Sequence, residues 1–341
     1  MYRIFQLGNV ILLLVFFLSC TNAKSSVEKD EDRFQADTLA VESSDPEPKL
    51  VESSDIEISK DLLYDKYTLE DSYEYEDTVR TFKWDTIKEY LAVVENHHDR
   101  PERWGVLQNY RNMNREAPLV HNWHRDEGYR LVTDSLGIHR YQSVPLYSES
   151  DSIVPRRYGR DGSPFHLIDS IGSFYKLSLL DSEEVWLTQK RYVTLVPDSV
   201  SIDHVVFVDV ADQNIASLER EAPAKWVVRS MNPATTGKHN PPYGHETPLG
   251  IFMLQQKKRK MFYLKDGTSD LAGYAPYASR FSNGGYIHGV PVNGVNSKEI
   301  EYSRTLGTIP RSHMCVRNAT SHAEFVYNWA PTLGAFVIVI E

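Results

Sequence analysis

The most informative stretch of this 341-residue chain is Ser312-His313-Met314-Cys315-Val316-Arg317. It holds a cysteine close to a histidine and an arginine, and a nearby cation favours the reactive thiolate over the thiol. The spacing of a capping box follows in Ser321-His322-Ala323-Glu324, directly before the apolar Phe325-Val326-Tyr327-Asn328-Trp329. We therefore expect a helix to begin just after the cysteine and Cys315 to act as a nucleophile.

The sequence around this stretch is rich in β-type runs. Short apolar or alternating segments separated by turn residues are typical of strands. The sequence therefore predicts a mainly β domain over residues 202–341, with one helix beside the cysteine. The expected strands are 204–210, 225–231, 249–254, 285–288 and 335–340.

Six segments of this domain, in this order along the chain, resemble the L,D-transpeptidase catalytic domain. The resemblance implies a β-sandwich with a helix beside the nucleophile, and an activity on the tetrapeptide stems of peptidoglycan. In that family a cysteine thioester forms, D-alanine leaves, and an amine from a neighbouring stem completes a cross-link between third-position residues. Exchange of the terminal D-alanine uses the same intermediate. The six segments are Ala234-Thr235-Thr236-Gly237, Thr247-Pro248-Leu249-Gly250-Ile251-Phe252, Ile287-His288-Gly289, Leu306-Gly307, Ser312 to Arg317, and Gly334.

The resemblance also assigns roles to individual residues. His288 becomes the base beside Cys315, oriented through its other ring nitrogen, and His313 becomes the residue that shapes the acyl pocket. The backbone N–H of Cys315 is a candidate oxyanion donor. Arg317 matches a position that would hold a stem carboxylate, although a structural salt bridge is an equally good interpretation. The remaining residues implied in substrate binding are Ser312, Gly289 and Tyr286.

Two features depart from the family pattern. Met314 occupies the position before the cysteine where the family usually has glycine, so a positive φ there would cost strain. The connection from His288 to Cys315 is also long, through residues 291–302. This segment acts either as a lid that excludes water or as a surface elaboration.

The region before this domain divides in two. Residues 62–136 are expected to be helical, because Trp84, Ile87, Leu91 and Val94 share one helical face. Residues 137–200 are expected to form a small β-barrel, since Val144-Pro145-Leu146-Tyr147 and Lys190-Arg191-Tyr192-Val193 resemble bacterial Src-homology-3-like barrels. Such a barrel either contacts cell-wall peptides or braces the catalytic domain.

The first sixty residues have the composition of an export signal and a tether. Residues 1–19 combine Arg3 with an apolar run, and Phe17-Leu18-Ser19-Cys20 resembles a bacterial lipobox. Lipidation of Cys20 would anchor the chain in the cell envelope, facing the periplasm, and in an outer membrane if the organism has one. The alternative is plain signal-peptide cleavage with Cys20 incidental.

The segment after Cys20 is strongly acidic. Residues 24–78 carry 18 acidic and 6 basic residues, a net of −12, so the rest of the chain carries +2 of the total −10. Residues 20–61 are therefore expected to form a disordered acidic tether. With Cys20 lipidated, Cys315 would be the one thiol of the mature chain, and a free thiol in an exported protein indicates reactivity.

Other residues favour no cofactor. The pairs His121/His124 and His97/His98 lack further ligands in a metal pattern, and neither a phosphate-binding glycine loop nor a basic nucleic-acid patch is present. The polar loop 234–247, with Tyr243, either borders the substrate groove or is a solvated connection. Two alternative functions remain open: a cell-wall cysteine peptidase or amidase with the same nucleophile, and a non-catalytic wall-binding lipoprotein.

Overall fold

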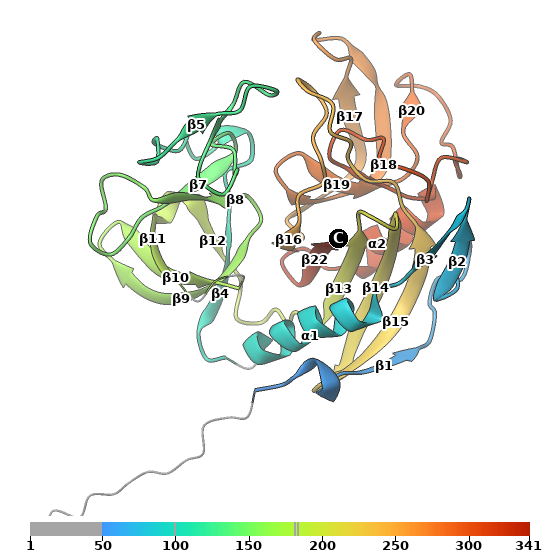
Figure 1. The fold of residues 1–341 in the computed structure, drawn as a ribbon, viewed down its shortest axis with the longest axis horizontal. Coiled ribbons are helices and arrows are strands. Elements are labelled where there is room, and N and C mark those ends of the chain that lie inside the picture. The colour runs from blue at the N-terminus through green and yellow to red at the C-terminus, as the bar shows by residue number, and fades with distance from the viewer. Residues whose placement is uncertain (1–49, 99, 181, 183) are drawn as a thin grey trace, which may run out of the picture. The chain divides into compact units, whose positions relative to one another are not determined.

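The computed structural model describes residues 50–98, 100–180, 182 and 184–341. Strands dominate the regular structure of this part of the chain, and its two α-helices are α1 (Trp84–His98) and α2 (Thr320–Trp329) (Figure 1). The predicted mainly β fold is confirmed. In the same residues, no helix has the length and apolar character needed to cross a bilayer.

A six-stranded sheet lies between the two helices. All six residues of its strand β22 are buried, and they alternate between two hydrophobic clusters. Phe336 and Ile338 pack in the cluster that contains the buried face of α1, whereas Val337 and Val339 pack in the cluster that contains Val326 of α2. A strand covered on both faces has a continuous apolar sequence, as this one does. The strands, in the order β1-β15-β14-β13-β22-β16, are β1 (Glu57–Lys60), β15 (Lys225–Pro233), β14 (Asn214–Ala222), β13 (His204–Asp209), β22 (Ala335–Ile340) and β16 (Gly250–Met253).

A second sheet carries the segment with Cys315. The long hairpin of β17 (Gln256–Leu264) and β18 (Leu271–Ser282) continues through a tight turn into β19 (Gly285–His288). β19 then pairs in parallel with β21 (Val316–Arg317), and β20 (Val292–Asn293) pairs with β18. The end of β19 therefore lies beside the chain that follows Cys315.

A small β domain, defined here as residues 103–196, precedes these sheets. Its core contains Leu107, Phe165, Leu177 and Tyr192, all fully buried. Its main sheet has the order β11 (Val185–Gln189), β10 (Phe174–Leu179), β9 (Pro164–Ile171), β4 (Arg103–Leu107) and β12 (Val193–Leu195). Further pairs are β7 (Ser143–Leu146) with β8 (Arg157–Arg160) and β5 (His124–Arg125) with β6 (Val132–Thr133), and two short 3-10 helices are η2 (Tyr110–Asn112) and η3 (Lys190–Tyr192).

The structure differs from the predicted boundaries in this region. The small β domain takes its strand β4 from residues 103–107, well before the expected start at 137. Residues 62–136, expected to be helical, contain one α-helix, α1, together with the β2 (Ser72–Tyr75) and β3 (Thr78–Thr81) hairpin and strands β4 to β6. Strands of two to five residues are too short to display a periodicity, so they could not be predicted from the sequence.

The predicted tether also ends earlier than residue 61. Residues 53–55 form the 3-10 helix η1 (Ser53–Asp55), and β1 adds a parallel strand to β15. Ile56, between them, is only 2% exposed. An acidic composition does not prevent a short segment from pairing with an open sheet edge, because the pairing uses the main chain. The predicted signal peptide, Cys20 and tether residues up to 49 lie outside the described residues.

Candidate active site

The two short parallel strands β19 and β21 place His288 and Cys315 on one face. Ile287 pairs with Val316 and His288 with Arg317, so Cys315 stands opposite Tyr286. Side chains alternate along a strand, and His288, Cys315 and Arg317 therefore project to the same side. The predicted helix after Cys315 is confirmed by α2, which begins at Thr320, but its N-cap is Ala319, so the capping box expected at Ser321 is wrong.

These three residues line one large cavity of about 1000 Å³. Ser312 and His313 line it too, whereas Gly289 and the side chain of Tyr286 do not. The Tyr286 hydroxyl instead lies 3.4 Å from that of Tyr110 in the small β domain. The walls come from the β17–β18 hairpin, from residues 290–306 and from Tyr243.

The Cys315 thiol is held by the turn between β18 and β19. It donates to the Gly284 carbonyl at 3.5 Å, and the Tyr286 N–H faces the sulfur. Burial raises the pKa of Cys315 to about 11, although the Tyr286 N–H and the Arg317 charge both act to lower it. The sequence led us to expect a lowered pKa for Cys315. This expectation was wrong because the sequence shows which charged residues are nearby but not how deeply the thiol is buried.

His288 has the orientation predicted for a base. Its Nδ1 donates to the Gly289 carbonyl at 2.6 Å, which leaves Nε2 as the ring nitrogen that can accept a proton. Burial lowers the pKa of His288 to about 4, and the Arg317 charge lowers it further while the Gly289 carbonyl raises it. The imidazole is therefore neutral at neutral pH and available as a base.

The peptide groups on both sides of Cys315 are fixed by hydroxyl groups. Thr247 Oγ1 donates to the Met314 carbonyl at 2.7 Å, and Ser312 Oγ donates to the Cys315 carbonyl. Since a trans peptide holds its C=O and N–H in opposite directions, the Thr247 bond also sets the direction of the Cys315 N–H. Thr247 in turn accepts from the Gly237 N–H at 2.8 Å, which joins two of the predicted segments to the peptide group before Cys315.

Met314 adopts a positive φ, the conformation for which the sequence predicted strain. Its φ is +105°, a region that glycine occupies freely and that a side chain makes unfavourable. The loop has little room to relax, because a Cβ on Gly237 would lie 2.7 Å from the Met314 Cα. The backbone before Cys315 is therefore strained.

The profile of the L,D-transpeptidase catalytic domain family matches residues 203–339. The chain contains an L,D-transpeptidase catalytic domain. It is the domain of a cysteine transpeptidase family that acts on peptidoglycan, and the match falls within the range expected from the sequence, residues 202–341.

Solved structures give weaker similarities. An L,D-transpeptidase from Mycobacterium smegmatis is 15% identical, with a TM-score of 0.34 over 52% of this chain and 82% of that chain. One from Mycobacterium tuberculosis H37Rv is 20% identical, with a TM-score of 0.32 over 55% of this chain and 70% of that chain. L,D-transpeptidase 3 from Mycobacterium tuberculosis, in complex with a faropenem-derived adduct, is 20% identical, with a TM-score of 0.33 over 46% of this chain and 73% of that chain. No curated protein matches the sequence.

Arg317 and His313 occupy different depths of the L,D-transpeptidase cavity. Arg317 is half-buried, and its Nε is buried without a hydrogen-bond partner in the described part of the chain. Burial lowers the pKa of this guanidinium, although Cys315 and Tyr263 oppose the shift. His313 lies at the rim, half exposed, with its Nε2 3.1 Å from Asp266 Oδ2 on the β17–β18 connection. A half-buried guanidinium whose Nε has no partner among the described residues suits a ligand with an anionic group.

The long connection after His288 forms one wall of the L,D-transpeptidase cavity. Ile300 and Tyr302 line the cavity, and Thr320 Oγ1 at the start of α2 holds the Ile300 carbonyl at 2.6 Å. The Tyr302 ring packs on Tyr67, with ring centroids 4.5 Å apart. Residues of this segment therefore form part of the cavity wall, and its role as a lid that excludes water stays a prediction.

Several cavity residues escaped the sequence reasoning. Tyr263 and Asp266 come from a hairpin without a motif, so the sequence offered no signal for them, whereas Tyr302 ends the segment 291–302 that was expected to be a lid or a surface elaboration. Tyr243 was foreseen in part, because loop 234–247 was polar and rich in turn residues. The cluster His239, His245 and Glu246 of that loop instead packs on Tyr129, away from the cavity lining. No group of three or more potential metal ligands occurs in the described residues.

Proposed function

We propose that this protein is an L,D-transpeptidase that acts on peptidoglycan tetrapeptide stems through a thioester on Cys315. Cys315 Sγ attacks the carbonyl of the L-centre of the third-position diamino acid, and the thiol proton passes to His288 Nε2. The peptide bond to the terminal D-alanine breaks, and the imidazolium returns the proton to the leaving amine. An acceptor amine then attacks the thioester, which regenerates the thiol and forms a new amide.

The observation that carries this proposal is the shared cavity of Cys315, His288 and Arg317. A neutral thiol beside a neutral imidazole suits proton transfer at the moment of attack rather than a preformed ion pair. The Cys315 N–H, aligned through the Thr247 bond to Met314, is the oxyanion donor that we propose. Arg317, with its unpaired buried Nε, is the proposed partner of a stem carboxylate.

The first test is intact-mass spectrometry of the full chain after incubation with a carbapenem, in the wild type and in Cys315→Ala. Ring opening of a β-lactam by a thiol loses no atoms, so we expect an adduct of the full carbapenem mass on the wild type alone. The alanine variant should keep its fold, because the change removes one sulfur from a loop. An adduct on both proteins would show that the nucleophile assignment is wrong.

A second measurement separates transfer from hydrolysis. With a purified tetrapeptide stem, we expect release of free D-alanine and formation of a cross-linked dimer or an exchanged D-amino acid. A product that consists only of the hydrolysed tripeptide would favour the cysteine peptidase or amidase. A folded protein that binds wall fragments but forms neither adduct nor product would favour the non-catalytic wall-binding lipoprotein.

We also propose that the chain is lipid-anchored through Cys20 and faces the periplasm. The support is the lipobox-like Phe17-Leu18-Ser19-Cys20 after an apolar run. The test is membrane fractionation of cells expressing the wild type or Cys20→Ala. The wild type should remain with membranes and carry fatty acid on its N-terminal peptide, whereas the variant should be released or remain unprocessed.

A further inference from the structure

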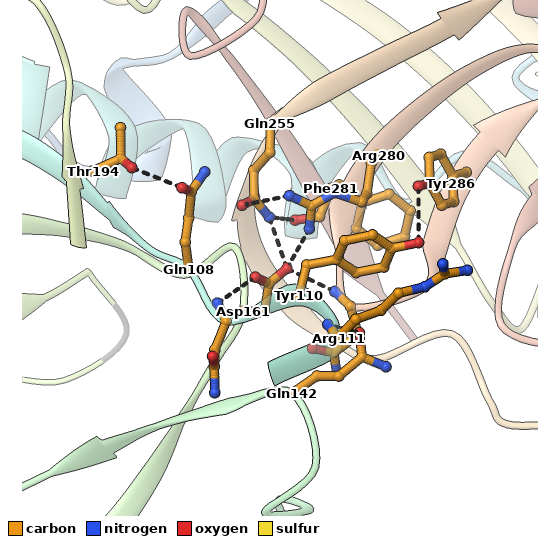
Figure 2. A network of polar contacts seen from close by, with 12 residues as sticks. Gln108, Tyr110, Arg111, Gln142, Asp161, Thr194, Gln255, Arg280, Phe281 and Tyr286 are labelled. Atoms are coloured by element: carbon orange, nitrogen blue, oxygen red, sulfur yellow. Dashed lines mark hydrogen bonds and ion pairs between the residues drawn. The ribbon is translucent and has the colours of Figure 1, made fainter. Parts of the chain in front are cut away.

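A buried carboxylate of the small β domain reaches the turn that holds Cys315. Asp161 lies in the connection between β8 and β9 and is 0% exposed. Its Oδ1 accepts from the Asn109 N–H of its own domain at 2.8 Å. Its Oδ2 accepts from three groups of the catalytic domain: Arg280 Nη1 at 2.5 Å, Gln255 Nε2 at 3.1 Å and the Asn283 N–H at 2.9 Å. Figure 2 shows Asp161 pointing toward Arg280 and Gln255, with Tyr110 beside them.

The chain around Asp161 is in direct contact with the end of β18. A Cβ on Gly162, whose φ is +96°, would lie 2.0 Å from the Phe281 carbonyl oxygen. The Gly162 carbonyl accepts from the Met253 N–H at 2.8 Å. Only glycine allows this approach, so the position of Asp161 relative to the β18–β19 turn is set by contact on two sides.

The turn that Asp161 binds is also the turn that contacts the nucleophile. Asn283, which donates to Asp161, has a φ of +42° and begins the step from β18 to β19. The next residue, Gly284, accepts the Cys315 thiol through its carbonyl, and the Tyr286 N–H faces the sulfur. A short path of main-chain atoms therefore joins the Asp161 carboxylate to both groups that surround Cys315 Sγ.

We propose that Asp161 is a positioning residue for Cys315: by fixing the Asn283 N–H, it sets where the Gly284 carbonyl and the Tyr286 N–H lie around the sulfur. The inference rests on the proposed role of Cys315 as the nucleophile. It gives the small β domain a part in the chemistry, because the residue that holds the turn belongs to that domain. Arg280 neutralises the buried carboxylate, and its guanidinium also lies over the Tyr110 ring, 4.6 Å from its centroid.

The test uses Asp161→Asn in the full chain with Cys20→Ser, so that Cys315 is the one thiol present. An asparagine must turn its amide group toward either Asn109 or the three donors of the catalytic domain, so it cannot satisfy both sides. We expect carbapenem acylation of Cys315 to slow by about tenfold to a hundredfold, as displacement of reacting groups by a fraction of an ångström does elsewhere. We also expect the pH midpoint of Cys315 alkylation by iodoacetamide to shift upward, because the Tyr286 N–H that lowers the pKa of the thiol is no longer held against the sulfur.

A matched control is Glu95→Gln. Glu95 is also a buried carboxylate with three donors, accepting from Arg220 Nε and Nη2, each at 2.9 Å, and from Trp226 Nε1 at 2.8 Å. It joins α1 to the six-stranded sheet and does not touch the β18–β19 turn. We expect it to lower the unfolding temperature comparably while leaving the acylation rate and the alkylation midpoint unchanged. A folded Asp161→Asn protein with wild-type acylation and an unshifted midpoint would overturn the proposal.

A second variant covers the case in which Asp161→Asn fails to fold. The double substitution Asp161→Leu with Arg280→Met replaces the buried ion pair by apolar side chains of similar size, an exchange that proteins often accept. The Asn109 and Asn283 N–H groups still lose their acceptor, so acylation should stay slow in the folded variant. Recovery of the wild-type rate would assign Asp161 a structural role only. If the wild type itself forms no carbapenem adduct, the proposed function fails, while the alkylation midpoint still tests the positioning role.

Discussion

His288, at the end of β19, and His322, within α2, are two buried histidines that differ in what they contact. Burial lowers the pKa of both, to about 4 for His288 and about 3 for His322. His288 holds the Gly289 carbonyl through Nδ1 and lines the cavity with Cys315. His322 Nε2 lies 3.0 Å from Ser230 Oγ, and its ring packs against those of Tyr64 and Phe325. A shifted pKa therefore marks burial, and access to the cavity marks the candidate base.

The largest expected effect comes from the same substitution at both histidines. We expect His288→Asn to slow carbapenem acylation of Cys315 by about 10²–10⁴-fold, the usual contribution of a general base. In the His322→Asn variant, Cys315 should be acylated at nearly the wild-type rate, because the His322 ring does not line the cavity. Time-resolved intact-mass spectrometry measures both rates on one scale.

Unfolding temperatures of the two variants supply the control. His322→Asn should lower the free energy of unfolding, since it leaves a void beside the rings of Tyr64 and Phe325 and weakens the contact with Ser230. An equal loss of acylation in two folded variants would break the comparison, because it would mean that the effect arises from α2 packing rather than from the base.

The pH dependence of stability should sharpen the comparison. Both imidazoles have folded-state pKa values below the ordinary 6.5, so below that pH the unfolded chain takes up protons that the folded chain does not. The free energy of unfolding should be greatest above pH 6.5 and fall toward acid, each histidine adding a slope of up to about 1.4 kcal/mol per pH unit. Denaturant titrations between pH 5 and 7, above the usual carboxylate range, measure this slope.

His322→Asn should reduce that slope by the contribution of about one proton, because one fewer histidine takes up a proton on unfolding. His288→Asn should reduce it by a similar amount. Neither residue needs to be catalytic for this result, which makes it independent of the acylation experiment. An unchanged slope in His322→Asn would contradict the assignment of a neutral, buried imidazole at that position.

The smallest expected effect concerns the turn that brings Cys315 to the side of His288. Met314→Gly should raise the free energy of unfolding by about 1 kcal/mol, because glycine adopts the +105° φ without the strain that a side chain causes. Met314→Ala keeps a Cβ and should bring no such gain. Denaturant unfolding of both variants at one pH makes the measurement, and equal stability of the two would mean that the turn relaxes by another route.

Much of the catalytic domain could be predicted from the sequence, because its segments keep their order and each carries a local pattern. The contacts between them bear this out: the Gly307 N–H donates to the Ala234 carbonyl, and Thr235 and Arg317 exchange main-chain bonds, all at 2.9 Å. The positive φ of Met314 confirms that this residue occupies a position that favours glycine. Local pattern and main-chain geometry were sufficient for these features.

The features that escaped prediction depend on distant partners. Asp161 lies in the short connection between β8 and β9, yet its partner Arg280 is 119 positions away, and no local pattern joins them. Strand β4 is likewise separated from β9 by more than fifty residues of other structure. The raised pKa of the Cys315 thiol also depends on packing from several elements, so the sequence supplied its charged neighbours and not its net shift.

Strand β1 has a consequence for solubility. It covers the edge of β15, whose main-chain groups would otherwise be open to pairing with another chain. β1 then becomes the new edge, but three of its four residues are exposed, among them the charged Glu57 and Lys60, and charged edges resist further pairing. Shortening the chain to begin after Lys60 would therefore leave a bare edge prone to aggregation, so the residues just before the catalytic core protect the enzyme from self-association.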